Sequence, residues 1–125
     1  MASVLIVDDD FLQALNLESF LQLQGHMVCG IAKSGEDAVT FAEDRMPDVV
    51  IMDVRLFGQL DGVEAAKRIV SRRRCGLIFV TGFPDARLDA LAPDAIIVKP
   101  ARAHAIHAAV ELVISQKRKA PAVVH

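Results

Sequence analysis

The sequence has no tryptophan, no tyrosine and only two cysteines among its 125 residues. Cys29 and Cys75 do not form a C-x-x-C pair, and each lies beside an apolar run. We therefore expect two buried free thiols rather than a disulfide or a metal site. No apolar run is long enough to cross a bilayer, and the N-terminus has no basic region followed by an apolar stretch. These absences favour a cytoplasmic protein that does not enter a membrane.

A large excess of charge of either sign is also absent, since the formal net charge is -2 and the pI is about 6.0. This balance argues against a general nucleic-acid-binding protein. The three arginines at 72–74 fall at the end of a predicted helix, where cations interact favourably with the helix dipole. We interpret this run as a solvated helix end.

Short apolar runs alternate with segments of helical period along the chain. The runs are apolar at nearly every position, as in strands that are covered on both faces of a parallel sheet. They predict five strands, at residues 4–7, 27–32, 49–52, 77–80 and 95–98. The intervening segments predict helices at residues 11–24, 36–45, 63–73 and 102–116.

Ser34 and Asp61 can cap two of these helices, because Asp37 and Glu64 follow three residues later, as in a capping box. Two prolines in the segment 84–93 leave room for only a short helix. The alternation predicts an α/β fold of the (βα)5 type, a doubly wound five-stranded parallel sheet with helices on both faces. The length and the apolar fraction of 53% suit one domain, which we assign to residues 1–116, followed by a C-terminal tail at 117–125.

Polar residues stand at the ends of four of the predicted strands. Ligands of such sheets bind beyond the carboxyl ends of the strands, so these residues are expected to meet at one edge. The residues at these ends are Asp8, Asp9 and Asp10 after the first strand, Asp53 after the third, Thr81 with Gly82 after the fourth, and Lys99 with Pro100 after the fifth.

Adjacent carboxylates repel one another, and burying any of them is costly. A divalent cation turns this repulsion into attraction, and Mg2+ prefers oxygen ligands. We therefore expect Mg2+ among Asp8, Asp9 and Asp53. A carboxylate can also act as a nucleophile and form an acyl phosphate, and Asp53, alone at the end of the middle strand, is the predicted phosphoacceptor. Lys99 and the Thr81 hydroxyl can then hold the phosphoryl oxygens.

With these residues in this order and spacing, the chain resembles the receiver domain of two-component response regulators over residues 4–115. The resemblance implies a flavodoxin-like sheet with strand order 2-1-3-4-5 and magnesium-dependent phosphorylation of Asp53. It also implies that Asp8 and Asp9 are the acidic pair that binds Mg2+. Arg55 matches the position that offers a backbone carbonyl to the metal.

The resemblance extends to the residues around this set. Thr81 matches the switch hydroxyl of the family and is followed by Gly82. Lys99 with Pro100 matches the family's lysine and its usual cis-peptide proline. Gly62 matches the turn before the third helix.

Three features depart from the family's usual pattern. Leu56 and Phe57 stand where Met-Pro is common, and this loop carries one extra residue. Thr81 and Lys99 are only 18 positions apart, which shortens or removes the fourth helix. Ile96 occupies the position of the usual rotating aromatic residue.

The stretch "IFVTGF" and the short segment after it resemble the atypical subgroup nicknamed FAT GUY receivers, which are often paired with HWE-type kinases. The hypothesis that follows is that Gly82 and Phe83, with the loop after them, carry the switch. Phosphate would draw Thr81 inward and reorder this loop.

We interpret the chain as a stand-alone receiver that accepts a phosphoryl group on Asp53 from a sensor histidine kinase or a phosphotransfer protein. It would signal to an unidentified downstream protein by a conformational change, or drain phosphate from the kinase, and it is not expected to be an enzyme. No nucleic acid or membrane partner is expected. The expected state is a monomer or a weak homodimer.

Two alternatives are open. A phosphorylation-independent pseudo-receiver would bind partners, but it has no need of the complete set of acidic and basic residues. A haloacid-dehalogenase-like phosphatase would use the Asp-x-Asp pattern of Asp8 and Asp10, but it needs a further acidic pair after the lysine strand and gives no role to Asp53. Asp10 is expected to begin the first helix instead.

Two surface features have separate interpretations. Leu17 and Leu21 lie off the main apolar side of the first helix, and they are either scattered surface leucines or a docking patch for a kinase helix. His104 and His107 share a helical face, but no third ligand is evident in the sequence. We expect these histidines on a solvated or partner-facing surface.

Overall fold

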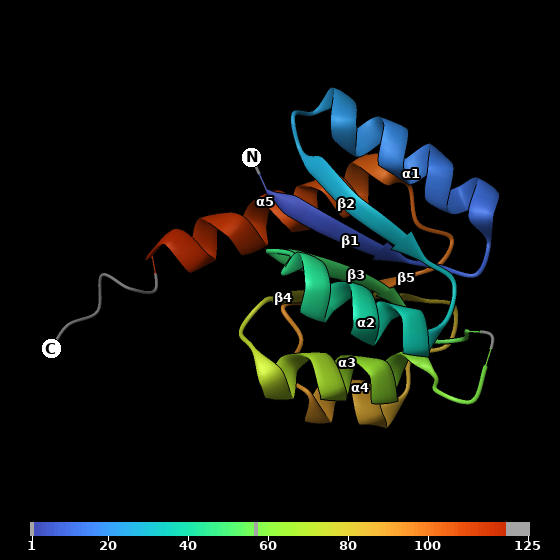
Figure 1. The fold of residues 1–125 in the computed structure, drawn as a ribbon. Coiled ribbons are helices and arrows are strands. Elements are labelled where there is room, and N and C mark those ends of the chain that lie inside the picture. Colours follow the sequence, from blue (N-terminus) through green and yellow to red (C-terminus); the bar gives the residue numbers. More distant parts are fainter. Residues whose placement is uncertain (1, 57, 120–125) are drawn as a thin grey trace, which may run out of the picture.

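The structure, a computed structural model, describes residues 2–56 and 58–119. Within these residues five strands alternate with five helices (Figure 1). The strands are β1 (Ser3–Val7), β2 (Met27–Ala32), β3 (Val49–Asp53), β4 (Gly76–Thr81) and β5 (Ala95–Val98). The helices are α1 (Phe11–Leu23), α2 (Gly35–Arg45), α3 (Gly62–Arg72), α4 (Ala86–Ala90) and α5 (Ala103–Lys119).

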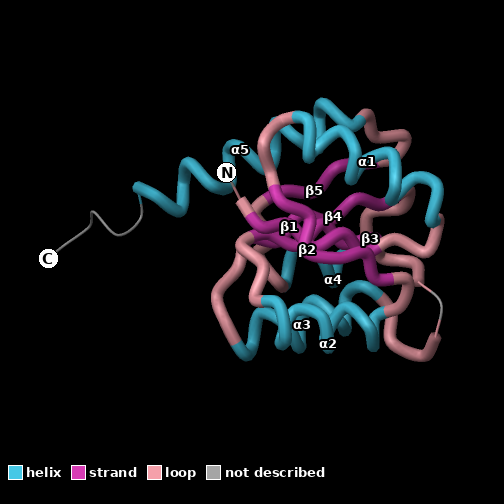
Figure 2. Tube along the Cα trace, turned by 45° about the horizontal axis from the view of Figure 1, so that its top comes forward, coloured by secondary structure: helices cyan, strands magenta, loops and turns pink. Residues whose placement is uncertain are grey.

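The strands form one parallel sheet in the order β2-β1-β3-β4-β5. The predicted (βα)5 fold and the strand order 2-1-3-4-5 are confirmed. Helices α1 and α5 cover one face of the sheet, and α2, α3 and α4 cover the other (Figures 1 and 2). Because all strands run in the same direction, the loops that follow them emerge at one edge, where side chains from different strands can meet.

Side chains along the strands alternate between the two faces of the sheet. On β1, Leu5 and Val7 belong to the core cluster shared with α2, α3 and α4, whereas Val4 and Ile6 belong to the cluster shared with α1 and α5. Strands β3 and β4 lie inside the sheet and are buried along their whole length. The last residue of each of these two strands is polar, so the topology places polar side chains at a buried edge.

Polar side chains fix the beginnings of three helices. Asp10, Ser34 and Asp61 precede α1, α2 and α3, and each side chain accepts a hydrogen bond from the backbone N–H three residues later. These contacts confirm the predicted helix starts, and α4 is short, as predicted. Helix α5 continues past the predicted end at residue 116 as far as Lys119, and residues 120–125 of the predicted tail lie outside the described residues. No described helix is both long and apolar enough to cross a membrane.

Two expectations about apolar residues are wrong. Leu17 and Leu21 are 8% and 0% exposed and pack between α1, α5 and the sheet, so they do not form an exposed docking patch. Together with Ala14 they recur at helical spacing, which is the pattern of the side of a helix that faces a core. Neither Cys29 nor Cys75 forms a disulfide in the described part of the chain, as expected, but both are only half-buried.

Candidate functional site

Three carboxylates and one ammonium group meet at the carboxyl edge of the sheet. Strand β1 pairs with β3 so that Val7 lies beside Met52. The residues that follow, Asp8 and Asp53, therefore stand side by side. Lys99 follows β5 and reaches past β4 to Asp53. The parallel topology thus gathers residues that are far apart in the sequence.

Asp53 is the most deeply buried member of this group, with 7% of its surface exposed. Its Oδ2 accepts a hydrogen bond from Lys99 Nζ at 2.9 Å, and its Oδ1 accepts one from the backbone N–H of Arg55 at 3.3 Å. A buried carboxylate needs such donors, because an unpaired buried charge is strongly unfavourable. Both oxygens of Asp53 face a donor, and its side chain is fixed at the end of β3.

The surroundings of Lys99 keep its ammonium group charged. Burial by itself lowers the pKa of Lys99, but the hydrogen bond to Asp53 and the attraction of its charge outweigh this effect. Asp8 and Asp9 add to the attraction, and the net result is a pKa above the ordinary value for lysine. Lys99 is therefore a fixed positive charge beside the Asp53 carboxylate.

The carboxylates carry more negative charge than Lys99 balances. One oxygen from each of Asp8, Asp9 and Asp53 lies within 4.8 Å of the other two. Burial is the main cause that raises the pKa of Asp8 above its ordinary value, and repulsion from Asp53 and Asp9 adds to it. The Asp10 backbone N–H, which donates to Asp8 at 2.8 Å, opposes this rise, as does Lys99. Oxygen donors with excess negative charge fit a hard divalent cation such as Mg2+, so these three carboxylates could hold one.

The hydroxyl of Thr81 is held by the loop between β4 and α4. Thr81 Oγ1 accepts a hydrogen bond from the Phe83 backbone N–H at 3.2 Å and donates to the Phe83 carbonyl oxygen at 3.4 Å. The guanidinium of Arg55 lies over the Phe83 ring, 4.5 Å from its centre. Gly82, between Thr81 and Phe83 in the sequence, is exposed. These contacts join the loop after β4 to the loop after β3.

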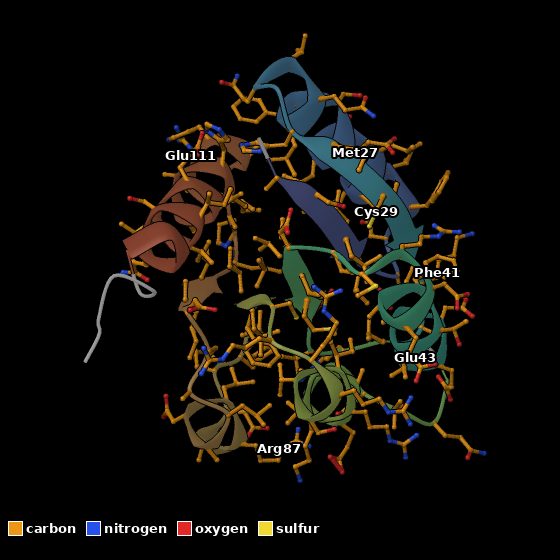
Figure 3. All side chains as sticks on the ribbon, turned by 60° about the vertical axis from the view of Figure 1, so that its left-hand side comes forward. Met27, Cys29, Phe41, Glu43, Arg87 and Glu111 are labelled. Atoms are coloured by element: carbon orange, nitrogen blue, oxygen red, sulfur yellow. The ribbon has the colours of Figure 1, made fainter. Side chains whose placement is uncertain are left out.

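Ion pairs hold α4 against the start of α3. Arg87, labelled on α4 in Figure 3, lies 3.0 Å from Asp61 and 2.8 Å from Asp85. Asp61 is also the residue that caps α3. The loop after β4 is therefore anchored by Thr81 at its beginning and by Arg87 at its end.

The backbone around the site requires a glycine at one position. Gly62 begins α3, and its N–H donates to the Val54 carbonyl at 2.8 Å. A Cβ at this position would collide with the backbone carbonyl of Asp53. Helix α3 can therefore start directly against the end of β3 only because residue 62 has no side chain. On the other side of the site, the peptide bond between Lys99 and Pro100 is cis.

A cleft of about 680 Å³ opens beside these charged groups. Its walls come from α1, from the loop after β4 and from the segment that joins β5 to α5. Asp8, Asp53 and Lys99 line it together with apolar residues such as Leu17 and Ile106. The cleft gives a group from another molecule a route to Asp53.

The likeness to known proteins agrees with this geometry. A family model described as the response regulator receiver domain matches residues 4–111. The chain belongs to the response regulator receiver family. The carboxylate of Asp10 caps α1. It is therefore not placed as the second acid that a haloacid-dehalogenase-like phosphatase would use.

Known regulatory proteins and a solved receiver domain match most of the chain. The transcriptional regulatory protein PdtaR of Mycobacterium tuberculosis is 36% identical over 120 residues, which cover 93% of this chain and 58% of PdtaR. The phyllosphere-induced regulator PhyR of Methylorubrum extorquens is 31% identical over 100 residues, which cover 78% of this chain and 38% of PhyR. The signal receiver domain of a modulated diguanylate cyclase from Desulfovibrio desulfuricans superposes with a TM-score of 0.86 at 35% identity, covering 94% of this chain and 97% of that one. The receiver spans only part of the length of PdtaR and PhyR.

The structure brings the predicted acidic residues and Lys99 together. Arg55 and Thr81 lie at the same edge, but the contacts that they make there differ from the predicted ones. Arg55 meets Asp53 through its backbone N–H, and its carbonyl oxygen stays a predicted metal ligand. The Thr81 hydroxyl contacts Phe83, at the same edge of the sheet. Phe57, in the loop with the extra residue, lies outside the described residues.

Sequence reasoning missed the surroundings of one histidine. His104 is exposed, as expected, but His107 is half-buried and contacts Glu111 and His26, so it does not lie on the predicted solvated or partner-facing surface. Glu111 follows His107 by four positions on α5, which is a local signal for one shared helix face. No local signal connects His26 to these two residues.

Proposed function

We propose that this receiver accepts a phosphoryl group on Asp53 from the phosphohistidine of a sensor histidine kinase of the HWE type or of a phosphotransfer protein. One observation carries the proposal. The Asp53 carboxylate is buried at the end of β3, lies 2.9 Å from the Lys99 ammonium, and is flanked by two further carboxylates at the foot of a cleft.

The transfer moves the phosphoryl group from nitrogen to oxygen. A carboxylate oxygen of Asp53 attacks the phosphorus atom, a P–O bond forms, and the P–N bond to the donor imidazole breaks. The imidazole leaves with the electron pair of that bond and takes up a proton, and Asp53 becomes an acyl phosphate. Charge stabilisation and positioning dominate such transfers, and Lys99 supplies a positive charge that is already in place.

The excess negative charge at this edge supports a role for Mg2+. Asp8, Asp9 and Asp53, with the backbone carbonyl of Arg55, would hold the ion. When bound, Mg2+ supplies positive charge that offsets the charge of the phosphoryl oxygens. The receiver itself contributes a carboxylate that cannot rotate freely and a set of oxygens that are already close together.

Thr81 connects phosphorylation to the loop after β4. A phosphoryl oxygen on Asp53 would compete with the Phe83 backbone for the Thr81 hydroxyl, and Phe83 would lose this contact when Thr81 turns inward. The loop would then rearrange and present a different surface to a downstream protein, or the receiver would simply drain phosphate from the kinase. Ile96 stands where other receivers carry a rotating aromatic residue, so this loop is the element proposed to change.

The first experiment measures the intact mass of the chain after incubation with acetyl phosphate, with and without Mg2+. We expect the mass of one phosphoryl group to be gained in the presence of Mg2+ and to be absent from the Asp53→Asn variant. Asp44→Asn, which changes an exposed aspartate on α2, is the matched control and should gain the same mass as the unmodified chain.

Two outcomes would overturn the proposal. One is a mass gain that persists in Asp53→Asn. The other is no gain either with acetyl phosphate or with a phosphorylated HWE-type kinase, which would favour the pseudo-receiver. For the loop, 15N relaxation of Gly82 and Phe83 is expected to change when a phosphate mimic is added, and unchanged relaxation would contradict the proposed switch.

A further inference from the structure

Two histidines and one glutamate converge at the amino edge of the sheet, the end opposite to Asp53. His26 lies in the turn between α1 and β2, and His107 and Glu111 lie one helical turn apart on α5. Glu111 is labelled on α5 in Figure 3, and α5 passes close to the beginning of the chain in Figures 1 and 2. None of these residues has a part in the proposed phosphorylation.

The donor atoms of this cluster are close together. Glu111 Oε1 lies 3.6 Å from His26 Nε2 and 3.4 Å from His107 Nε2, and one ligand atom from each of the three residues lies within 4.8 Å of the other two. Donors bound to a tetrahedral zinc ion at about 2.0–2.1 Å are about 3.3 Å from one another. The two separations from Glu111 are therefore close to those across a tetrahedral metal site.

Burial gives the second and independent observation. The side chain of His26 is only 2% exposed, and that of His107 is 19% exposed. Neither Nε2 atom has a hydrogen-bond partner in the part of the chain that the structure describes. Both nitrogens face the Glu111 carboxylate at ion-pair distance but without a hydrogen bond, whereas buried polar atoms are nearly always hydrogen-bonded.

We propose that His26, His107 and Glu111 form a Zn2+ site. Two imidazole nitrogens and one carboxylate oxygen are ligands that suit this borderline-soft ion, and a water molecule would complete the tetrahedron. Metal binding gives both unpaired nitrogens a partner. The ion would join the turn before β2 to α5 and so fasten α5 to the sheet.

One existing contact must change when the metal binds. His26 Nδ1 accepts a hydrogen bond from the Ala2 backbone N–H at 3.1 Å, so the proton of the neutral ring is on Nε2. Zn2+ on Nε2 moves that proton to Nδ1, which then no longer accepts from Ala2. The Ala2 N–H, which is buried, therefore loses its acceptor and must shift away from the ring, and its NMR signal reports metal binding at His26.

The test titrates Zn2+ into the untagged chain by calorimetry, in a large excess of Mg2+ that occupies the acidic cluster at the other edge. We expect one Zn2+ per chain and a shifted Ala2 amide signal. Glu111→Gln and His107→Gln each remove one ligand from the surface of α5, and each is expected to weaken binding by about tenfold or more.

Two controls separate this site from other histidines and from the phosphorylation site. His104→Gln removes an exposed histidine on the same helix, and Asp53→Asn removes a carboxylate from the opposite edge. Both are expected to bind Zn2+ as the unmodified chain does, and phosphorylation of Asp53 in the unmodified chain should leave Zn2+ binding unchanged.

The proposal is overturned if the unmodified chain does not bind Zn2+ at one ion per chain. It is also overturned if His107→Gln and Glu111→Gln bind as tightly as the unmodified chain, or if Asp53→Asn abolishes binding. Circular dichroism of each variant confirms that a loss of binding is not a loss of fold.

Discussion

The two edges of the sheet differ in whether their buried polar atoms are hydrogen-bonded. At the carboxyl edge, both oxygens of the Asp53 carboxylate have a donor, and Lys99 offsets part of the charge. At the amino edge, the Nε2 atoms of His26 and His107 face Glu111 without a hydrogen bond in the described part of the chain. The first edge holds the Asp53 carboxylate in one position. The second holds two imidazole nitrogens near one carboxylate oxygen without a hydrogen bond to it.

The largest expected effect comes from removing the charge that distinguishes the carboxyl edge. Lys99→Met keeps a long unbranched side chain but leaves the buried Asp53 carboxylate without its ammonium partner. The rate of phosphoryl gain from acetyl phosphate is expected to fall by about 100-fold or more, as when one preorganised electrostatic donor is removed from an active site. Intact mass measured over time gives this rate.

This prediction has a matched control variant and a definite outcome that would contradict it. Lys67→Met changes an exposed lysine on α3 that pairs with Glu64 on the same helix, and it should leave the rate unchanged. If Lys99→Met were phosphorylated as fast as the unmodified chain while folded, the ammonium would have no part in the transfer.

The next effect tests how closely the backbone is packed beneath the charges. Gly62→Ala places a methyl group against the Asp53 carbonyl, and the start of α3 must move away. We expect the free energy of unfolding to fall by about 1–3 kcal/mol, which is typical of overpacking, and the phosphorylation rate to fall with it. Urea denaturation measures the change in stability.

Gly82→Ala is the control for this prediction, because a Cβ at Gly82 meets nothing within 4 Å. It should leave the free energy of unfolding nearly unchanged. Equal losses in the two variants would show that the collision at Gly62 is relieved by a small shift of α3.

The carboxyl edge could be predicted from the sequence because each of its residues directly follows a recognisable strand. Asp8, Asp53 and Lys99 are local markers of strand ends, and a parallel topology is enough to gather them. The amino edge could not be predicted in this way. His26 and His107 come together only because α5 packs beside α1, and this packing has no local signature.

Tertiary packing without a local signature also explains why the burial of Leu17 and Leu21 on α1 was not predicted. Apolar residues occur on several sides of this helix, so their period does not show which side faces the sheet. Leu17 and Leu21 turn out to be buried because α5 and the sheet cover them, whereas Leu12 and Leu23 are 73% and 84% exposed. Only the tertiary structure decides between these sides.

The smallest expected effect compares the two edges through the ions proposed for them. The pKa of Asp8 is raised, mainly by burial, so the folded protein holds this proton more tightly than the unfolded chain does. Ionised Asp8 therefore lowers the stability of the metal-free protein above the raised pKa, and the penalty disappears below the ordinary value of 3.8. At pH 7, Asp8→Asn should raise the free energy of unfolding by at most about 1 kcal/mol.

Adding Mg2+ sharpens this comparison, because an ion that binds only the folded state stabilises it. Mg2+ is expected to raise the unfolding midpoint of the unmodified chain and of Glu111→Gln, but not that of Asp8→Asn. Thermal denaturation with and without Mg2+ measures the three differences. If Glu111→Gln lost the stabilisation by Mg2+, or Asp8→Asn kept it, the ion would act at the amino edge and the assignment of Mg2+ to the three aspartates would be wrong.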